Sequence, residues 1–335
     1  MEYKPLGRAG VKVSEICLGT MMFGGPSNES DSIRMIHRAL DAGINFLDTA
    51  NVYNDGQSER IVGKAIHSIR DRVVIATKVC GPMGEGPNQS GSSRHHILFQ
   101  VEESLRRLNT DRIDVYYLHR PDPTTPIEES LRALDDCVTQ GKVRYIACSN
   151  FDAWRVYEGL SVSEQMNLEH FVCVQPLYNI VNRGIEVELL PLCQQRGLGV
   201  VPYSPLARGV LSGKYRSGQP PPDGSRAARR DRRLLQTELR EESYEVARQL
   251  IPLAEGHSKT LTQFALAWVL ANPIITSVII GPRTMQQLDD NLGCLDCVLS
   301  ESDEATIDQL VPRGERTGKG HIDPAYPVLG RPIRE

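Results

Sequence analysis

Short runs of β-branched and aromatic residues alternate with longer amphipathic stretches along almost the whole chain. The strand-like runs are, in order, Glu15–Gly19, Asn45–Asp48, Val73–Lys78, Ile113–His119, Tyr145–Ser149, Cys173–Gln175, Val200–Tyr203 and Ser277–Ile280. The stretches between them include predicted helices at Asp31–Ala42, Arg94–Leu108, Ile127–Gln140 and Glu186–Arg196. This alternation predicts βαβ units around a parallel sheet that is buried on both faces.

The number of strands decides between an open sheet and a closed barrel. Eight units favour closure, and no G-x-G-x-x-G motif, typical of a dinucleotide-binding open sheet, follows the first strand. We therefore expect an α/β fold, a (β/α)8 TIM barrel. The opening segment Tyr3–Val13, with Gly7 and Gly10, predicts a β-hairpin that plugs the barrel floor. Two extra helices are predicted at Glu241–Glu255 and Ser302–Leu310.

The first predicted helix indicates how each unit packs. Ile33, Ile36, His37 and Leu40 share one face at helical spacing, and Gly43 supplies a stop. We expect this face to lie against the sheet. Over the whole chain we expect a single domain, 1–335, with the barrel over about 14–295 and a C-terminal tail over 296–335, which is rich in Pro and Gly after Val311.

Composition and charge narrow the class of protein. With 40% hydrophobic and 24% charged residues, the 335-residue chain resembles an ordinary globular protein. A formal net charge of −4 offers no general attraction to nucleic acid or anionic membranes, so neither is an expected partner. The first ten residues lack the apolar region of a secretory signal. The uncharged stretch Thr260–Pro282 is cut by Asn272-Pro273, which predicts a helix, a turn and a strand rather than a membrane span.

The eight cysteines argue for a reducing compartment and against a metal site. Cys294-x-x-Cys297 has no second Cys or His pair near it, as a zinc site would require. Cys17, Cys148 and Cys173 lie in apolar runs, where buried inert thiols are common. We expect a cytoplasmic protein without structural disulfides or metal.

One segment differs from the rest in composition. Ser217–Arg233 contains three consecutive prolines, two glycines and then five arginines. Such a loop is usually solvated and mobile. Its place after the seventh strand, on the face where barrels bind their ligands, leaves a functional lid as the alternative.

Four polar side chains stand at or just after the ends of successive strands. Asp48 ends the second, Tyr53 lies in the loop that follows, Lys78 ends the third, and His119 ends the fourth. Each could have a purely structural role. In a barrel, however, the carboxyl ends of these strands converge on one mouth, so the four groups can meet.

Their chemistry suits the reduction of a carbonyl. Hydride addition leaves an alkoxide that needs a proton, and a phenol is a poor donor near neutrality unless its anion is stabilised. An adjacent ammonium favours the phenolate, and a carboxylate keeps that ammonium charged. A neutral imidazole can donate a hydrogen bond to the carbonyl oxygen.

Three segments around these residues resemble the signatures of the aldo-keto reductase family. They are GINFLDTANVY at Gly43–Tyr53, ATK at Ala76–Lys78 and DVYYLHRP at Asp114–Pro121. The resemblance extends from about Tyr3 to Leu295. It implies an NADPH-dependent oxidoreductase that reduces aldehydes or ketones, in which Tyr53 is the general acid, Lys78 and Asp48 tune it, and His119 helps to bind the carbonyl.

The same resemblance implies an NADPH site. Ser149, Asn150 and Gln175 would hold the nicotinamide carboxamide, Tyr203 would stack on its ring, and Arg283 would meet the adenosine 2′-phosphate at the start of a helix near Thr284. The other residues that it implies around the cofactor are Thr20, Met21, Asp48, Ser204, Pro205, Leu206, Ala207, Lys214, Gly281, Gln287 and Asn291.

Other readings stay open. The channel-associated β subunits share the fold and the Tyr203–Lys214 pattern, but they typically have Asn where this chain has His119. A barrel lyase or isomerase would need a metal cluster or another acid/base pair, and the sequence offers neither. The expected partner is a small carbonyl compound, and the chain also allows a homo-oligomer. After Leu295 no motif is matched, so the substrate is undefined.

Overall fold

Eight parallel strands form the main sheet of the computed structural model, which describes residues 1–318 and 323–326. They are β3 (Ile16–Gly19), β4 (Phe46–Asp48), β5 (Val74–Val79), β6 (Ile113–Leu118), β7 (Val143–Ser149), β8 (Phe171–Gln175), β9 (Gly199–Val200) and β10 (Val278–Ile280). Each coincides with or overlaps one predicted run, so all eight predicted strands are confirmed. Of the tail expected over 296–335, residues 319–322 and 327–335 lie outside the described part.

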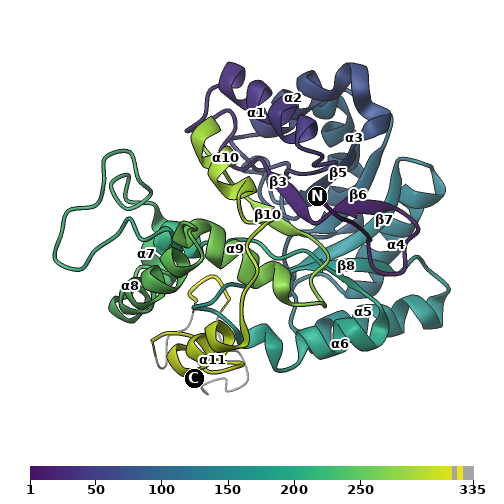
Figure 1. Ribbon diagram of the computed structural model, residues 1–335. Coiled ribbons are helices and arrows are strands. Elements are labelled where there is room, and N and C mark those ends of the chain that lie inside the picture. Colours follow the sequence, from purple (N-terminus) through teal and green to yellow (C-terminus); the bar gives the residue numbers. More distant parts are fainter. Residues whose placement is uncertain (319–322, 327–335) are drawn as a thin grey trace. The chain divides into compact units, whose positions relative to one another are not determined.

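The sheet closes on itself. Its strand order is β10-β3-β4-β5-β6-β7-β8-β9, which follows the chain apart from β10. Between the two edge strands, the amide of Thr276 donates to the Val200 carbonyl at 2.9 Å. The amide of Ile279 donates to the Pro202 carbonyl at 3.0 Å. The predicted (β/α)8 fold is therefore confirmed (Figure 1).

The chain divides into two compact units. The barrel unit comprises Met1–Leu177, Ile185–Tyr203 and Leu270–Leu292. The second unit comprises Tyr178–Gly184, Ser204–Val269 and Gly293–Glu335. The ten strands found among the described residues all lie in the barrel unit, so its architecture stands by itself.

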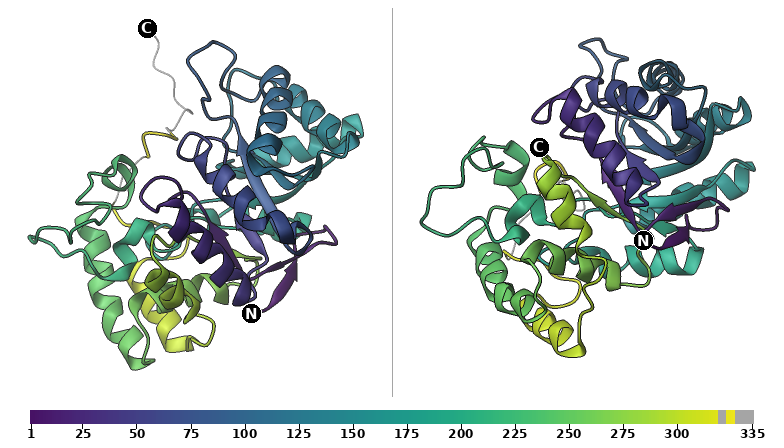
Figure 2. Two further views of the ribbon diagram at one scale, coloured as in Figure 1. Left: turned by 90° about the horizontal axis from the view of Figure 1, so that it is seen from above. Right: turned by 45° about the horizontal axis from the view of Figure 1, so that its top comes forward.

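Helices surround the strands of the barrel unit. They are α1 (Glu29–Asp41), α2 (Gln57–Ile66), α3 (Arg94–Leu108), α4 (Ile127–Thr139), α5 (Ala153–Met166), α6 (Leu189–Arg196) and α10 (Met285–Leu292). Consecutive helices from α1 to α6 contact each other, and α10 contacts α1. Figure 2 shows them outside the strands in both views. Helix α6 starts later than predicted, because a separate 3-10 turn, Gly184–Glu186, precedes it.

The face by which α1 packs differs from the predicted one. Its buried residues are Ser32, Met35, Ile36 and Ala39, so only Ile36 of the predicted face is buried. The small Ser32 and Ala39 side chains face the core instead, and His37 turns toward α2, where its Nε2 lies 3.0 Å from the Ala65 carbonyl oxygen. The helix is therefore confirmed and its predicted face is partly correct: Ile36 is buried, Ile33 and Leu40 are half-buried, and His37 is exposed.

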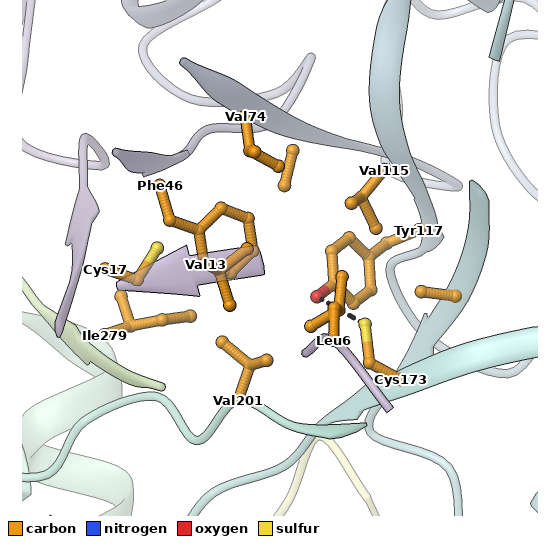
Figure 3. Packing of buried hydrophobic residues seen from close by; sticks show 12 residues of the cluster. Leu6, Val13, Cys17, Phe46, Val74, Val115, Tyr117, Cys173, Val201 and Ile279 are labelled. Carbon is orange, nitrogen blue, oxygen red and sulfur yellow. Dashed lines mark hydrogen bonds between the residues drawn. The ribbon is translucent and has the colours of Figure 1, made fainter. Parts of the chain in front are cut away.

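The predicted hairpin is present and fills one end of the barrel. Strands β1 (Tyr3–Pro5) and β2 (Lys12–Ser14) pair in antiparallel fashion. Leu6 and Val13 are fully buried among the inward-pointing side chains of the barrel strands, as Figure 3 shows. Gly7 has a positive φ of 60°, and a Cβ at this position would lie 2.3 Å from the Val172 carbonyl oxygen. Only glycine fits so close to the strand backbone.

The second unit consists of helices and loops. It contains the 3-10 turn η3 (Ala207–Ser212), α7 (Arg232–Thr237), α8 (Glu241–Gly256), α11 (Glu301–Leu310) and most of α9 (Leu261–Ala271). The two predicted extra helices correspond to α8 and α11. In the basic loop, Arg226 pairs with Asp231 and Arg233 pairs with Asp323. Among the helices that the structure describes, none combines the length and apolar character needed to cross a membrane.

Candidate active site

The carboxyl ends of neighbouring barrel strands bring the four predicted catalytic side chains to one place. Asp48 is the last residue of β4, Lys78 is the penultimate residue of β5, and His119 directly follows β6. Tyr53 lies in the loop between β4 and α2. All four belong to the barrel unit, so their mutual geometry is defined within it.

Lys78 is the centre of this cluster. Its side chain is fully buried, and Nζ lies 2.5 Å from Asp48 Oδ1, 2.7 Å from the Thr49 carbonyl oxygen and 3.2 Å from the Tyr53 hydroxyl. Burial by itself disfavours the charged amine, but attraction to Asp48 and Tyr53 outweighs that effect and raises the pKa of Lys78. Lys78 is therefore an ammonium at neutral pH, with an oxygen for each of its three protons.

Asp48 connects Lys78 to the opposite side of the mouth. Its second carboxylate oxygen accepts a hydrogen bond from Gln175 Nε2 of β8 at 2.8 Å. Both oxygens thus have a partner, and the buried charge is paired and hydrogen-bonded as burial requires. The Asp48 carboxylate fixes the ends of β4, β5 and β8 relative to one another.

A tight loop presents Tyr53. Its amide donates to the Ala50 carbonyl at 3.1 Å, and the next three residues, Asn54, Asp55 and Gly56, all have positive φ. This left-handed run turns the chain directly into α2. The Tyr53 ring stands edge-on to the His119 ring, with centroids 5.9 Å apart. Lys78 Nζ lies 4.9 Å from the centroid of the Tyr53 ring.

His119 is held as a neutral imidazole. Its amide donates to the Val79 carbonyl at 2.8 Å, which fixes the backbone beside Lys78. Although its side chain is partly exposed, loss of hydration, together with the charges of Lys78 and Arg120, lowers the pKa of His119 to about 3. The ring can therefore donate one hydrogen bond without carrying charge at neutral pH.

Four predicted cofactor residues form a second hydrogen-bonded group next to these side chains. Ser149 Oγ donates to the Gln175 carbonyl at 2.7 Å, and Asn150 Nδ2 donates to the His119 carbonyl at 2.8 Å. The Tyr203 hydroxyl donates to Asn150 Oδ1 at 2.8 Å. The structure thus brings Ser149, Asn150, Gln175 and Tyr203 together with His119.

Thr20 and Met21, which follow β3, lie on the other side of the cluster. The Thr20 hydroxyl donates to the Asp48 carbonyl at 3.0 Å and is fully buried. The Met21 carbonyl accepts a hydrogen bond from Asn54 Nδ2 at 3.0 Å, so it supports the loop that carries Tyr53. The Met21 side chain is exposed.

The residues predicted for the 2′-phosphate gather at the start of α10. The Arg283 amide donates to Gln287 Oε1 at 2.8 Å, and Ser27 Oγ donates to the Arg283 carbonyl at 2.9 Å. Asn291 is buried one turn further along the same helix. Gly281 is exposed, with open space above its Cα. Gly281, Arg283 and Gln287 therefore lie at or just before the start of α10, whereas Asn291 lies near its C-terminal end.

The remaining predicted cofactor residues, Ser204, Pro205, Leu206, Ala207 and Lys214, lie in the second unit. Within it the first four form a turn in which Ser204 and Ala207 have left-handed backbones, with φ of 54° and 46°. The Lys214 side chain folds back over Gly209, where a Cβ would lie 2.7 Å from Nζ. Ser204–Ala207 thus form one turn, and Lys214 follows the 3-10 turn η3 that comes after it.

Sequence reasoning missed several groups that support the site. The Thr49 carbonyl accepts a hydrogen bond from Lys78 Nζ. The buried side chains of Ser58 and Glu59 lie directly behind the Tyr53 loop. Polar residues such as Ser58 and Glu59 are common at the start of a helix, where they are usually exposed. Only their burial in the fold indicates a further role.

Comparison with known proteins agrees with this geometry. The model of the aldo/keto reductase family matches residues 15–312. An "Uncharacterized oxidoreductase YrpG" of Bacillus subtilis (strain 168) is 38% identical over 323 residues, which cover 93% of this chain and 96% of the relative. A "Probable voltage-gated potassium channel subunit beta" of Oryza sativa subsp. japonica is 38% identical over 303 residues, 89% of this chain and 92% of the relative. A protein of the same description from Arabidopsis thaliana is 37% identical, with the same coverage.

The family match and the Bacillus relative support a general oxidoreductase role. The matched range includes the strand ends that carry Asp48, Lys78 and His119 and the loop that carries Tyr53. The chain belongs to the aldo/keto reductase family.

Proposed function

We propose that this protein reduces an aldehyde or ketone to the alcohol with NADPH, and that Tyr53 is the general acid. The observation that carries the proposal is the contact between the Tyr53 hydroxyl and Lys78 Nζ, at 3.2 Å, with Asp48 holding the ammonium from the other side at 2.5 Å. A phenol is a useful acid near neutral pH only when such a cation stabilises its anion.

The proton step follows from this arrangement. The Tyr53 O–H bond breaks as its proton passes to the substrate oxygen, and the phenolate that remains faces the Lys78 ammonium. Asp48 keeps Lys78 charged throughout, because its carboxylate stays next to the ammonium and is fixed there by the hydrogen bond from Gln175. His119, neutral and edge-on to Tyr53, donates to the same substrate oxygen and orients the carbonyl.

The donor set beside Tyr53 fits a nicotinamide cofactor. A hydroxyl and two carboxamide side chains, those of Ser149, Asn150 and Gln175, are complementary to the carboxamide of nicotinamide, and Tyr203 adds an aromatic ring at the same place. Bound NADPH would supply the hydride to the carbonyl carbon. Arg283 and the start of α10 would hold the 2′-phosphate, and the five predicted residues of the second unit remain further proposed contacts.

A second candidate is a regulatory subunit with slow turnover, since two plant relatives are described as probable channel β subunits. This chain has a neutral imidazole at His119, next to the proposed acid, which favours repeated turnover. A regulatory subunit would bind NADPH but oxidise it only slowly.

The test is turnover with NADPH. Purified protein is mixed with NADPH and a panel of aldehydes and ketones, and absorbance of the reduced cofactor is followed. Tyr53→Phe should lower kcat about 10²–10⁴-fold without loss of NADPH affinity, since the ring is kept and only the proton is removed. Tyr157→Phe on the exposed face of α5 is the matched control. If Tyr53→Phe retained a third or more of the wild-type kcat, Tyr53 would not be the acid.

A further inference from the structure

A buried network behind the Tyr53 loop has no part in the chemistry above. Glu59, in the first turn of α2, is fully buried, and both of its carboxylate oxygens are hydrogen-bonded. Oε1 accepts from the Thr77 hydroxyl at 2.5 Å, and Oε2 accepts from Arg107 Nε at 2.5 Å. Arg107, on α3, is itself buried and donates to Ser104 through Nη2 at 3.2 Å. A fully buried ion pair is costly to desolvate, so its presence needs a reason.

The network is joined to both halves of the proposed acid pair. On the strand side, Thr77 directly precedes Lys78, and successive side chains of a strand point to opposite faces. The Thr77 side chain therefore points outward, where its hydroxyl donates to Glu59 of α2, while Lys78 points inward to Asp48 and Tyr53. On the loop side, the amide of Ser58, next to Glu59, donates to the Tyr53 carbonyl at 3.3 Å.

The same first turn of α2 is fastened to two other strand ends. The Ser58 hydroxyl lies 2.7 Å from that of Thr20 and 2.9 Å from that of Thr49. Arg107 also sets the shape of the loop: a Cβ at Gly56 would lie 2.6 Å from Arg107 Cδ, so the guanidinium stem packs directly against the residue that enters α2. The start of α2 therefore has little freedom to move relative to Lys78.

We propose that Glu59 and Arg107 are positioning residues for Tyr53: through Thr77 and the turn at Gly56 they fix the Tyr53 hydroxyl at contact distance from Lys78 Nζ. Neither touches the proposed substrate or cofactor residues. The inference rests on the proposed function of Tyr53 only for its effect on rate. Its structural content, the separation of the phenol from the ammonium, can be measured without turnover.

The experiment uses Glu59→Gln and Thr77→Val, with Asp114→Asn as the matched control. Asp114 also forms a largely buried pair with an arginine, Arg70, at 2.8 Å, and it also holds β5, through the Ile75 amide at 2.7 Å. It does so at the opposite end of the strand. Asp114→Asn should therefore lower the melting temperature as Glu59→Gln does, and leave Tyr53 where it is.

Turnover kinetics and the phenol titration separate positioning from stability. For Glu59→Gln we expect kcat to fall about 10- to 100-fold, with a smaller change in KM, because a displacement of about 1 Å is enough for such a loss. The alkaline limb of the kcat profile should move to higher pH, since the phenolate loses its cation. The titration of the Tyr53 phenol, taken as the ultraviolet difference from the same protein carrying Tyr53→Phe, should move in the same direction. Thr77→Val should show both effects more weakly.

The outcomes are distinct. If Glu59→Gln and Thr77→Val lowered only the melting temperature, as Asp114→Asn does, the network would be structural and the proposal wrong. If Glu59→Gln does not fold, Thr77→Val decides, because it removes only a hydroxyl. If the wild-type protein reduces no carbonyl compound, the proposed function fails, but the phenol titrations of the same variants still decide whether the Glu59 network positions Tyr53.

Discussion

Two neighbouring residues at the barrel mouth, Lys78 and His119, differ in charge. Lys78 is fully buried and charged, because three oxygens surround its ammonium. His119, beside it, is neutral, because loss of hydration and then the Lys78 ammonium lower the pKa of its imidazole. The site therefore separates one permanent cation from one neutral donor, and each of these states can be tested by a single substitution.

Lys78→Met should abolish most of the reduction, by about 10²-fold or more, and move the alkaline limb of the pH profile upward. The cation that favours the Tyr53 phenolate is lost, and Asp48 loses its ion-pair partner. Steady-state rates between pH 6 and 10 provide the measurement. Lys64→Met, on the exposed side of α2, is the control for loss of a lysine. An unchanged profile would reduce Lys78 to a structural strand residue.

The depressed pKa of His119, about 3 against an ordinary value near 6.5, also predicts a pH dependence of stability. Below pH 6.5 the unfolded chain binds a proton at this position that the folded chain does not bind. Stability is therefore complete above pH 6.5 and falls as pH falls toward 3, by at most about 2 kcal/mol at pH 5. Urea unfolding of wild type and His119→Asn at pH 7 and pH 5 tests this. The variant should lose less stability than wild type over this interval, and equal losses would contradict the assignment.

Which residues could be predicted from sequence depends on what their role requires. Asp48, Lys78 and His119 were predictable because strand ends of a barrel converge and because their side chains are chemically complementary. Glu59 and Arg107 were not, because they are 48 positions apart and both lie on amphipathic helices, where charged residues are usually exposed. Only the fold shows that these two charges face inward.

At the scale of elements, strands were easier to predict than helix faces. Buried parallel strands are continuous apolar runs, so neighbouring structure hardly changes their boundaries. The exception is β9, predicted over Val200–Tyr203 but paired only over Gly199–Val200. The amides of Val201 and Tyr203 still donate to the Val174 and Pro176 carbonyls at 2.9 Å, but Pro176 has no amide to donate in return, so the continuous ladder ends at Val200. In α1, Ser32, Met35 and Ala39 share the buried face with Ile36, so this face is rotated from the predicted one.

The start of α10 carries the prediction for cofactor choice. Arg283→Ala should weaken NADPH binding about 10- to 100-fold and leave NADH binding nearly unchanged, because only NADPH offers a 2′-phosphate to the guanidinium. Gln287 already accepts from the Arg283 amide, so the helix start should survive the substitution. Fluorescence titration of both cofactors is the measurement, with Arg38→Ala on the neighbouring helix α1 as the control. Equal losses for both cofactors would mean that Arg283 does not recognise the phosphate.

For the whole molecule, the division into two units marks the limit of what sequence could supply. The barrel unit contains the four proposed catalytic residues, and its repeat is regular enough to be read from periodicity. The second unit is built from irregular connections, and residues beyond Leu295 match no motif that the sequence analysis identified. Loops of barrels shape the substrate pocket, so the identity of the carbonyl compound has to come from the substrate panel.

The closure of the barrel by β9 implies a weak seam. Strand β9 is matched with β8 at two residue pairs, whereas β6 and β7 are matched at five. Beyond β9, the chain runs through residues 204–269 before it returns to β10, so the contacts that close the ring link distant parts of the sequence. Local opening should begin where the ladder is shortest. In native-state hydrogen exchange, the amides of Thr276 and Ile279 should exchange well before those of Tyr116 and Ile146. The barrel would then open locally between β9 and β10 while the remaining strands stay paired.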